Sequence, residues 1–124
     1  MNLSSILLVG FGAAIGGIAR YLTSLIIVSP IGSFPWATFA VNIIGSFIIG
    51  LVVFSFSERS TDESMRLLVG VGFCGGLTTF STFSVEILQL FQMQREAIAF
   101  AYIGASLVCS FAATYAGYAI ARHI

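Results

Sequence analysis

Four long apolar stretches, separated by short polar segments, make up most of this chain. They cover residues 3–28, 31–57, 67–85 and 97–121, and only the first contains a charged residue, Arg20. An α-helix rises about 1.5 Å per residue, so about 20 residues cross a bilayer core of about 30 Å. The pattern therefore predicts an all-α integral membrane protein, with residues 1–124 forming one domain of four transmembrane helices.

Composition agrees with this prediction and excludes several other classes of protein. Hydrophobic residues make up 58% of the chain and charged residues 8%. The runs are continuous rather than alternating, which favours helices over a β-barrel. The N-terminal run has no basic segment before it and is too long for a secretory signal, so we expect the first helix to remain in the mature protein. There is no lysine and the net charge is zero, so nothing indicates nucleic-acid binding.

The arginines predict only a weak preference for one orientation in the membrane. With four spans, one side carries Arg59, Arg66 and Arg122, and the other carries Arg95 together with Arg20 from the far half of the first span. Orientation follows the difference in Lys and Arg between short loops. A count of three against two leaves two alternatives open, insertion in both orientations or a modest preference for a cytoplasmic N-terminus.

Transport through so small a chain would require at least two copies, because four helices enclose little space. Small residues recur at four-residue spacing in the first and fourth stretches, which allows close helix contact. They are Gly12 and Gly16, Ala13 and Gly17, and Ala113, Gly117 and Ala121. This pattern fits packing between copies or packing within one chain.

Hydroxyl groups form a stripe along the fourth stretch. Tyr102, Ser106, Ser110 and Thr114 follow one another at four-residue spacing, which predicts a gently spiralling stripe about 18 Å long. A single Ser or Thr usually bonds back to its own helix. Four in register indicate a face that lines something wet or ionic. In the second stretch, Asn42 either joins two helices or donates its amide to an anion.

The third stretch contains poor helix formers at its centre. Gly70, Gly72, Gly75 and Gly76 precede Thr78 and Thr79, which predicts a break in the helix at membrane depth. Such a break frees carbonyl groups that suit a cation and amide groups that suit an anion.

After the predicted break, the segment TFSTFS places aromatic rings beside hydroxyl groups. Phe80 and Phe83 share a helix face, with Ser81, Thr82 and Ser84 nearby. Aromatic packing is one reading of this pattern. The other is an anion path, since ring edges are positive and hydroxyls donate hydrogen bonds without holding the ion by a full charge.

Two ionisable residues within or next to the spans are further candidates. Intramembrane Arg20 and nearby Glu86 are functional candidates by default, although Arg20 could extend to the interface and Glu86 could mark the end of the third span. Cys74 and Cys109 both fall within spans, where packing is the preferred role. We expect His123 to be solvated.

These elements resemble the Fluc (CrcB-type) fluoride channels of bacteria. The matching segments are GGIARY (16–21), ATFAVNIIGSFIIG (37–50), GFCGGLTTFSTFSVE (72–86) and the hydroxyl stripe, so the resemblance covers nearly the whole chain. It implies a fluoride-selective channel that exports F⁻ passively across the bacterial inner membrane and relieves fluoride toxicity. It also implies a dual-topology homodimer, two antiparallel copies in lipid with two pores.

The resemblance also implies roles for particular residues. Phe80 and Phe83 would present ring edges to fluoride, Asn42 would donate nearby with Ser81 and Thr82, and the stripe Tyr102, Ser106, Ser110 and Thr114 would form the ion track. A structural Na⁺ at the dimer centre would be held by the main-chain carbonyls of Gly75 and Thr78. Arg20 and Glu86 would lie near the pore entrances.

Two other functions remain as alternatives. A small proton-coupled multidrug-type exporter would use a membrane carboxylate, but the first span has none, so Glu86 would have to serve. A scaffold subunit would need only the small-residue packing and would leave the hydroxyl stripe unexplained. An enzyme is not expected, since there is no nucleophile and base pair, metal-ligand spacing or phosphate-binding loop.

Overall fold

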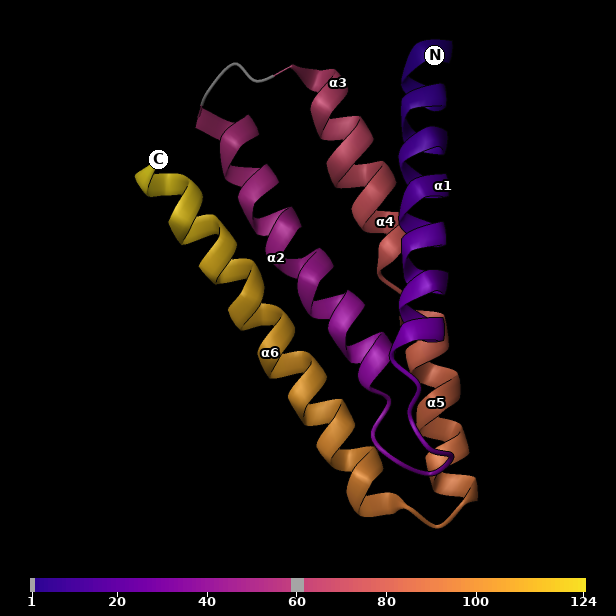
Figure 1. Ribbon diagram of the computed structural model, residues 1–124. Coiled ribbons are helices and arrows are strands. Elements are labelled where there is room, and N and C mark those ends of the chain that lie inside the picture. Colours follow the sequence, from indigo (N-terminus) through magenta and orange to yellow (C-terminus); the bar gives the residue numbers. More distant parts are fainter. Residues whose placement is uncertain (1, 59–61) are drawn as a thin grey trace.

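The computed structural model describes residues 2–58 and 62–124, which form helices joined by short connections (Figure 1). The described chain has four segments long and apolar enough to cross a membrane, as the sequence predicts. The first, second and fourth are single helices, whereas four successive elements make up the third. In order, the elements are α1 (Leu3–Ile26), α2 (Trp36–Glu58), α3 (Glu63–Met65), η1 (Arg66–Cys74), α4 (Gly75–Leu77), α5 (Phe80–Gln92) and α6 (Glu96–His123).

Successive spans run in alternating directions. Both chain termini lie at one end of the molecule, and the α1–α2 and α5–α6 connections lie at the other (Figure 1). Arg66 and Arg122 therefore lie towards the end that carries the termini, and Arg95 lies at the opposite end. Arg59, which belongs to the predicted charge balance, lies outside the described residues.

The α1–α2 connection is longer than the sequence pattern suggests. Helix α1 ends at Ile26 and α2 begins only at Trp36, where the apolar pattern places the second span from residue 31. Pro30 and Pro35 disfavour a helical conformation at the residues that precede them. Between them the chain turns, with the Ser33 amide donating to the Pro30 carbonyl at 3.0 Å and Gly32 at a φ of 81°. Apolar residues here therefore belong to a connection.

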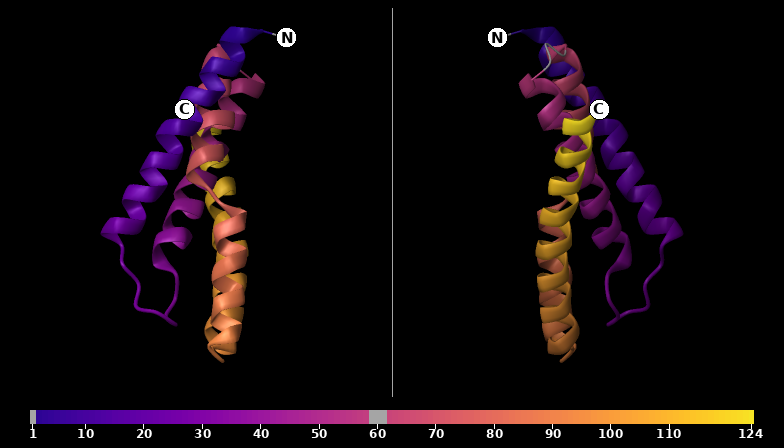
Figure 2. Two further views of the ribbon diagram at one scale, coloured as in Figure 1. Left: turned by 90° about the vertical axis from the view of Figure 1, so that its right-hand side faces the viewer. Right: turned by 90° about the vertical axis from the view of Figure 1, so that its left-hand side faces the viewer.

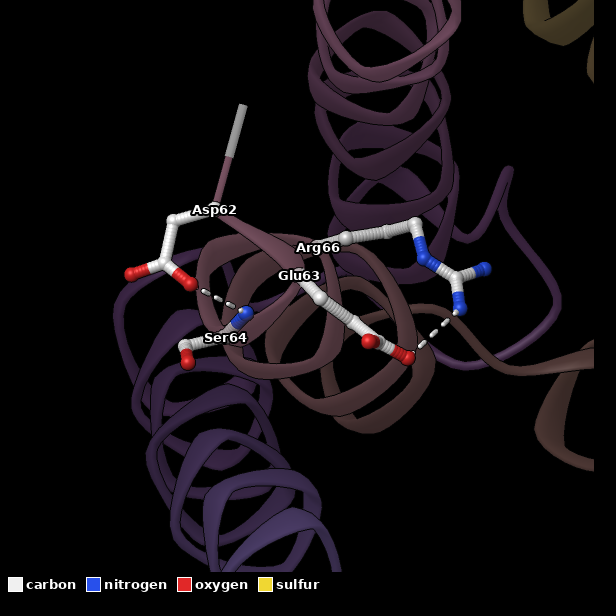
Figure 3. Close-up of polar contacts among 4 residues, drawn as sticks. All are labelled: Asp62, Glu63, Ser64 and Arg66. Carbon is white, nitrogen blue, oxygen red and sulfur yellow. Dashed lines mark hydrogen bonds and ion pairs between the residues drawn. The ribbon is translucent and has the colours of Figure 1, made fainter. Parts of the chain in front are cut away.

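The third span is longer than residues 67–85 at both ends. Asp62 caps its beginning, because its side chain accepts a hydrogen bond from the Ser64 amide at 3.0 Å (Figure 3). Arg66 and Glu63 form an exposed ion pair one turn later, at 3.8 Å. At the other end α5 continues to Gln92, so Glu86 lies within the helix. The expectation that Glu86 marks the end of the span is therefore wrong.

Glycines bring pairs of helices into backbone contact within one chain. A Cβ atom at Gly12 would overlap the Leu68 carbonyl oxygen, and one at Gly16 would overlap that of Phe73, so α1 lies directly against η1 and α4. In the same way Gly50 and Gly117 hold α2 against α6. The small-residue pattern at Gly12, Gly16 and Gly117 thus serves packing within the chain, one of the two alternatives left open by the sequence.

Most large apolar side chains face outward. Phe11, Ile18, Phe100 and Phe111 expose more than half of their surface, as expected where lipid is the solvent. A cluster of buried residues joins Phe83 and Leu90 of α5 to Ala99 and Tyr102 of α6. In edge-on views α5 overlaps α6, while α1 and α2 diverge from them towards the end that carries the connections (Figure 2).

Candidate functional site at the break of the third span

The third span is interrupted at two threonines, not at its glycines. Thr78 and Thr79 have extended backbones, with φ/ψ of −80°/155° and −152°/120°. Gly70, Gly72, Gly75 and Gly76 all lie in helical segments. The predicted break is present, but its cause differs from the prediction. Gly72 and Gly76 allow close approach to α1. The interruption itself is occupied by β-branched threonines, whose hydroxyls compete for backbone groups.

Asn42 of α2 bonds to both backbone groups of Thr79 and supplies the acceptor that the Thr79 amide lacks at the interruption. Its Oδ1 accepts from the Thr79 amide at 2.8 Å, and its Nδ2 donates to the Thr79 carbonyl at 3.2 Å. The side chain therefore joins two helices, the first of the two roles left open by the sequence. The Asn42 amide nitrogen carries two hydrogens, and Thr79 takes one of them. Asn42 also borders the cavity described below.

Thr79 also begins the second half of the span. Its Oγ1 accepts from the Thr82 amide at 3.1 Å, which caps the N-terminus of α5, and lies 3.2 Å from the Ser81 hydroxyl. Sequence reasoning noted Thr79 only as a poor helix former. Thr is a preferred N-cap residue, whose side chain accepts from the amide two or three positions later in the helix. This preference could have identified Thr79 as the cap.

A cavity of about 470 Å³, lined by apolar side chains and a row of polar ones, extends from the break along α2 and α6. Asn42 and Ser46 contribute from α2, and Ser106, Ser110 and Thr114 contribute from α6. Gly75, Thr78 and Thr79 line it at the break, and Phe80 and Phe83 line it on α5. Ser46 was not predicted. It lies four residues after Asn42, so the spacing rule used on the fourth span would have found it.

Ser106 has a buried hydroxyl whose hydrogen-bonding capacity is unused. The residue is 7% exposed, and its Oγ has no hydrogen-bond partner among the described residues. Thr114, in contrast, donates to the Ser110 carbonyl at 3.0 Å, the usual bond of a Thr to its own helix. A buried hydroxyl without a partner is costly. Ser106 is therefore the member of the stripe with the clearest need for a ligand or water.

Tyr102 does not belong to this cavity, contrary to the predicted continuous track. Each four-residue step rotates a helix position by about 40°, so Tyr102 and Thr114 face directions about 120° apart. The Tyr102 ring is fully buried and its hydroxyl donates to Glu86 Oε2 at 2.6 Å. Thr38 donates to Glu86 Oε1, also at 2.6 Å. Both carboxylate oxygens thus accept hydrogen bonds, in a cluster formed by α2, α5 and α6.

Phe80 and Phe83 lie together as predicted, but their surroundings differ. Their ring centroids are 5.6 Å apart, and both rings border the cavity. Phe83 is 8% exposed and packs on Tyr102 with centroids 4.9 Å apart. Phe80 is 77% exposed in the single chain. One ring is therefore fixed by the core of the chain, and the other has no comparable support from it.

Ser81 and Thr82, predicted beside these rings, do not line the cavity. Two successive positions on a helix are about 100° apart, so Thr82 projects about 200° away from Phe80. Thr82 instead borders a second cavity of about 290 Å³, together with Arg20, Tyr21, Thr38 and Glu86. The prediction that Ser81 and Thr82 donate to an ion beside the two rings has no support from this cavity.

Arg20 points inward from α1. Its Nε donates to the Gly76 carbonyl oxygen at 3.1 Å, within the last turn before the break. Extension to the membrane interface, one of the two readings of this residue, is therefore not observed. A third cavity of about 610 Å³, between the α1–α2 connection and α5, shares Ser24, Ala37, Thr38 and Glu86 with the second cavity. Glu86 thus borders two adjoining spaces.

Two backbone carbonyls at the break have no helical donor and could bind a cation. In an uninterrupted helix the Thr79 and Thr82 amides would donate to the carbonyls of Gly75 and Thr78. They donate instead to Asn42 and to the Thr79 side chain, so these two carbonyls lose their helical donors. Carbonyl oxygens are ligands that hard cations accept. The described residues contain no cluster of His, Cys, Asp and Glu that could hold a metal ion.

Comparisons with known proteins agree with the resemblance seen in the motifs. The family model described as "CrcB-like protein, Camphor Resistance (CrcB)" matches residues 7–118. The chain is 44% identical over 124 residues to a "Fluoride-specific ion channel FluC" from Agrobacterium fabrum, with 97% of this chain and 98% of the relative covered.

Relatives from other bacteria carry the same name. One from Phenylobacterium zucineum is 39% identical, with 98% of each chain covered, and one from Leptospira interrogans is 43% identical, with 94% of each chain covered. A match of this extent includes the break, the cavity and the Glu86 cluster. The chain therefore belongs to the CrcB-like family.

Proposed function

We propose that this protein is an ion channel that conducts fluoride passively across the membrane and is not an enzyme. The observation that carries the proposal is the cavity beside the break, which offers donors without a fixed positive charge. Among the described residues, Asn42 has an amide hydrogen to spare and the Ser106 hydroxyl is unpartnered, and two phenylalanine rings form the adjoining wall. Such a lining binds a small anion weakly enough for it to leave. The names of the relatives support fluoride as the ion.

The functional unit is a homodimer of antiparallel copies. Phe80 is 77% exposed and borders a cavity that also holds polar groups, so in an isolated chain these polar groups would meet lipid. Polar groups in lipid are costly unless protein covers them. A second copy laid over this face supplies the cover, and the spread of arginines over both ends supports opposite orientations. In a bacterium, passive export through such a dimer in the inner membrane lowers internal fluoride.

A sodium ion is the cofactor that the break fits. The Gly75 and Thr78 carbonyls would hold it, since both have lost their helical donors. When bound, it supplies a positive charge that neutralises carbonyl oxygens at membrane depth. Two copies related by a two-fold axis would contribute two carbonyls each.

Substituting the two rings tests the proposed path. Phe80→Ile removes a largely exposed ring, so the fold should keep its stability while fluoride efflux from liposomes falls sharply. Phe83→Ile should reduce both, because that ring also packs on Tyr102. Normal fluoride efflux from a folded Phe80→Ile protein would contradict the role of the ring.

The alternative of a proton-coupled exporter has one candidate carboxylate. In the structure both oxygens of Glu86 accept hydrogen bonds, which leaves this group poorly placed to exchange a proton for a substrate. A pH gradient imposed across the liposomes separates the two functions. A channel passes fluoride down its own electrochemical gradient at fixed voltage, whereas an exporter would accumulate or expel its substrate against a gradient.

A further inference from the structure

Arg20 makes a contact that a residue serving only as a pore-entrance charge would not need. Its Nε donates to the Gly76 carbonyl oxygen at 3.1 Å, across 56 positions of the sequence. The described residues contain no ion pair to Arg20. Its fixed partner is therefore a backbone carbonyl in the third span.

The fold brings Arg20 to this carbonyl by close helix packing. Gly12, Gly16 and Arg20 follow at four-residue spacing on α1, and the two glycines allow backbone contact with η1 and α4. Gly76 itself lies against Ala13, where a Cβ atom would overlap the Ala13 carbonyl oxygen. Because the backbones on both sides are in contact, the Arg20 stem begins at a fixed distance from the end of α4.

The carbonyls at the break differ in whether they have a hydrogen-bond donor. The last four carbonyls of a helix have no helical donor, and here the last helical turn leads into Thr78. Arg20 takes the carbonyl of Gly76. The carbonyls of Gly75 and Thr78 lose their donors because the Thr79 and Thr82 amides bond elsewhere. A guanidinium at a helix C-terminus also complements the negative end of the helix dipole.

We infer that Arg20 is a positioning residue, whose Nε–H fastens the Gly76 carbonyl and so keeps the neighbouring carbonyls of Gly75 and Thr78 available for a hard cation. The part that concerns the cation rests on the proposed function. Arg20 acts in this role through its hydrogen-bond donor rather than through its charge. Arg20 also lines the second cavity, together with Thr38, Thr82 and Glu86.

Three variants separate the donor from the charge. Arg20→Gln places an amide nitrogen at the chain position of Nε and removes the charge. Arg20→Lys keeps the charge, but its nitrogen lies one atom further along the side chain. Arg20→Met removes both. If Arg20 acts through its donor, Arg20→Gln should keep the break as ordered as in the native protein, and Arg20→Lys should disturb it as much as Arg20→Met. If Arg20 acts through its charge, Arg20→Lys should behave like the native protein and Arg20→Gln like Arg20→Met.

Hydrogen exchange measures the break without reference to any ion. The amides of Thr78, Thr79 and Thr82 donate to Cys74, Asn42 and the Thr79 side chain, and they report on its order. Loss of the donor at the position of Nε should speed their exchange about tenfold or more in Arg20→Met and Arg20→Lys. Arg20→Gln should stay within about threefold of the native protein, since a neutral donor retains most of the bond.

The sodium dependence of thermal stability, measured in detergent against a matched series in N-methylglucamine, gives the second readout. Arg20→Met and Arg20→Lys should need about tenfold more Na⁺ for half of the stabilisation. Arg20→Gln should need no more than the native protein, because a nearby positive charge has gone while the carbonyls stay fixed. If the thermal stability of the native protein does not depend on Na⁺, the sodium proposal fails. The ranking of the three variants by amide-exchange rate then still decides the role of Arg20.

Three results would overturn the inference. Native-like exchange in Arg20→Lys with fast exchange in Arg20→Gln would assign the role to the charge. Native exchange in all three variants would mean that the contact fixes nothing. Failure of Arg20→Gln to assemble, although it retains the donor, would show that the donor is not what the break requires.

Discussion

At the scale of single residues, the polar groups in and around the site have hydrogen-bonding capacity that is either used or left unused. Asn42 satisfies both backbone groups of Thr79, and Glu86 has a donor on each oxygen. Ser106 has none among the described residues. Residues of the first kind hold the structure, and a residue of the second kind is available to an ion. These two classes predict opposite responses to substitution.

Ser106→Ala should lower fluoride efflux without lowering stability. The hydroxyl has no partner in the described chain, so its removal ends the cost of burying an unpaired polar group, and the free energy of unfolding should stay equal or rise by up to about 1 kcal/mol. Equilibrium unfolding in detergent and liposome efflux measure the two effects. A loss of stability would contradict this account, because it would reveal a bond in the folded chain.

Tyr102→Phe should destabilise the fold, because it leaves a carboxylate oxygen of Glu86 without its donor. We expect a loss of about 1–3 kcal/mol in the free energy of unfolding. Tyr115→Phe on the same helix is the matched control, since that residue is 72% exposed, and its effect should stay within about 0.5 kcal/mol. Equal effects of the two variants would argue against the Glu86 cluster as a source of stability.

At the scale of helices, close packing of α1 against the third span sets where the broken helix lies. This packing depends on Gly16, while its neighbour Gly17 has open space at the position of a Cβ atom. The contrast between adjacent residues provides an internal control for the packing.

Gly16→Ala should destabilise the protein by about 1–3 kcal/mol, because the added methyl overlaps the Phe73 carbonyl and forces the helices apart. Gly17→Ala should be neutral or stabilising by up to about 1 kcal/mol, since alanine favours a helix. Thermal unfolding of both variants in the same detergent gives the comparison. Equal tolerance would mean that α1 does not lie so close to η1 and α4.

How much of these elements the sequence predicts depends on the range of the interactions involved. Hydropathy predicts four spans, and the glycine and threonine content predicts a break, because both are local properties. Helical spacing groups Phe80 with Phe83 correctly. It fails for Tyr102 and Thr82, since a four-residue repeat drifts and neighbouring positions diverge. The partners of Arg20 and Glu86 lie on other helices, 56 and 48 positions away in the case of Gly76 and Thr38, and no local pattern indicates them.

At the scale of the whole molecule, a dual-topology dimer requires that the same chain insert in both orientations. Lysines at one end should remove that freedom. Met65 and His123 lie at the end that carries the termini, and Gln92 lies at the other end. Met65→Lys with His123→Lys should fix one orientation and abolish efflux. Met65→Lys with Gln92→Lys adds the same charge at opposite ends and should preserve it.

Accessibility of a single introduced cysteine to a membrane-impermeant reagent would report the orientation of each double variant, in a chain whose two native cysteines are replaced. Full efflux from a protein shown to insert in one orientation would rule out the antiparallel dimer. It would leave a parallel assembly as the conducting unit.

The central claim is that uncharged donors and aromatic rings beside a broken helix allow fluoride alone to cross. Its most direct test is ion-electrode recording of fluoride and chloride efflux from liposomes that contain the purified protein, with a potassium ionophore to clamp the voltage. The account predicts rapid loss of fluoride and retention of chloride. Retention of fluoride, or loss of chloride at a comparable rate, would contradict it.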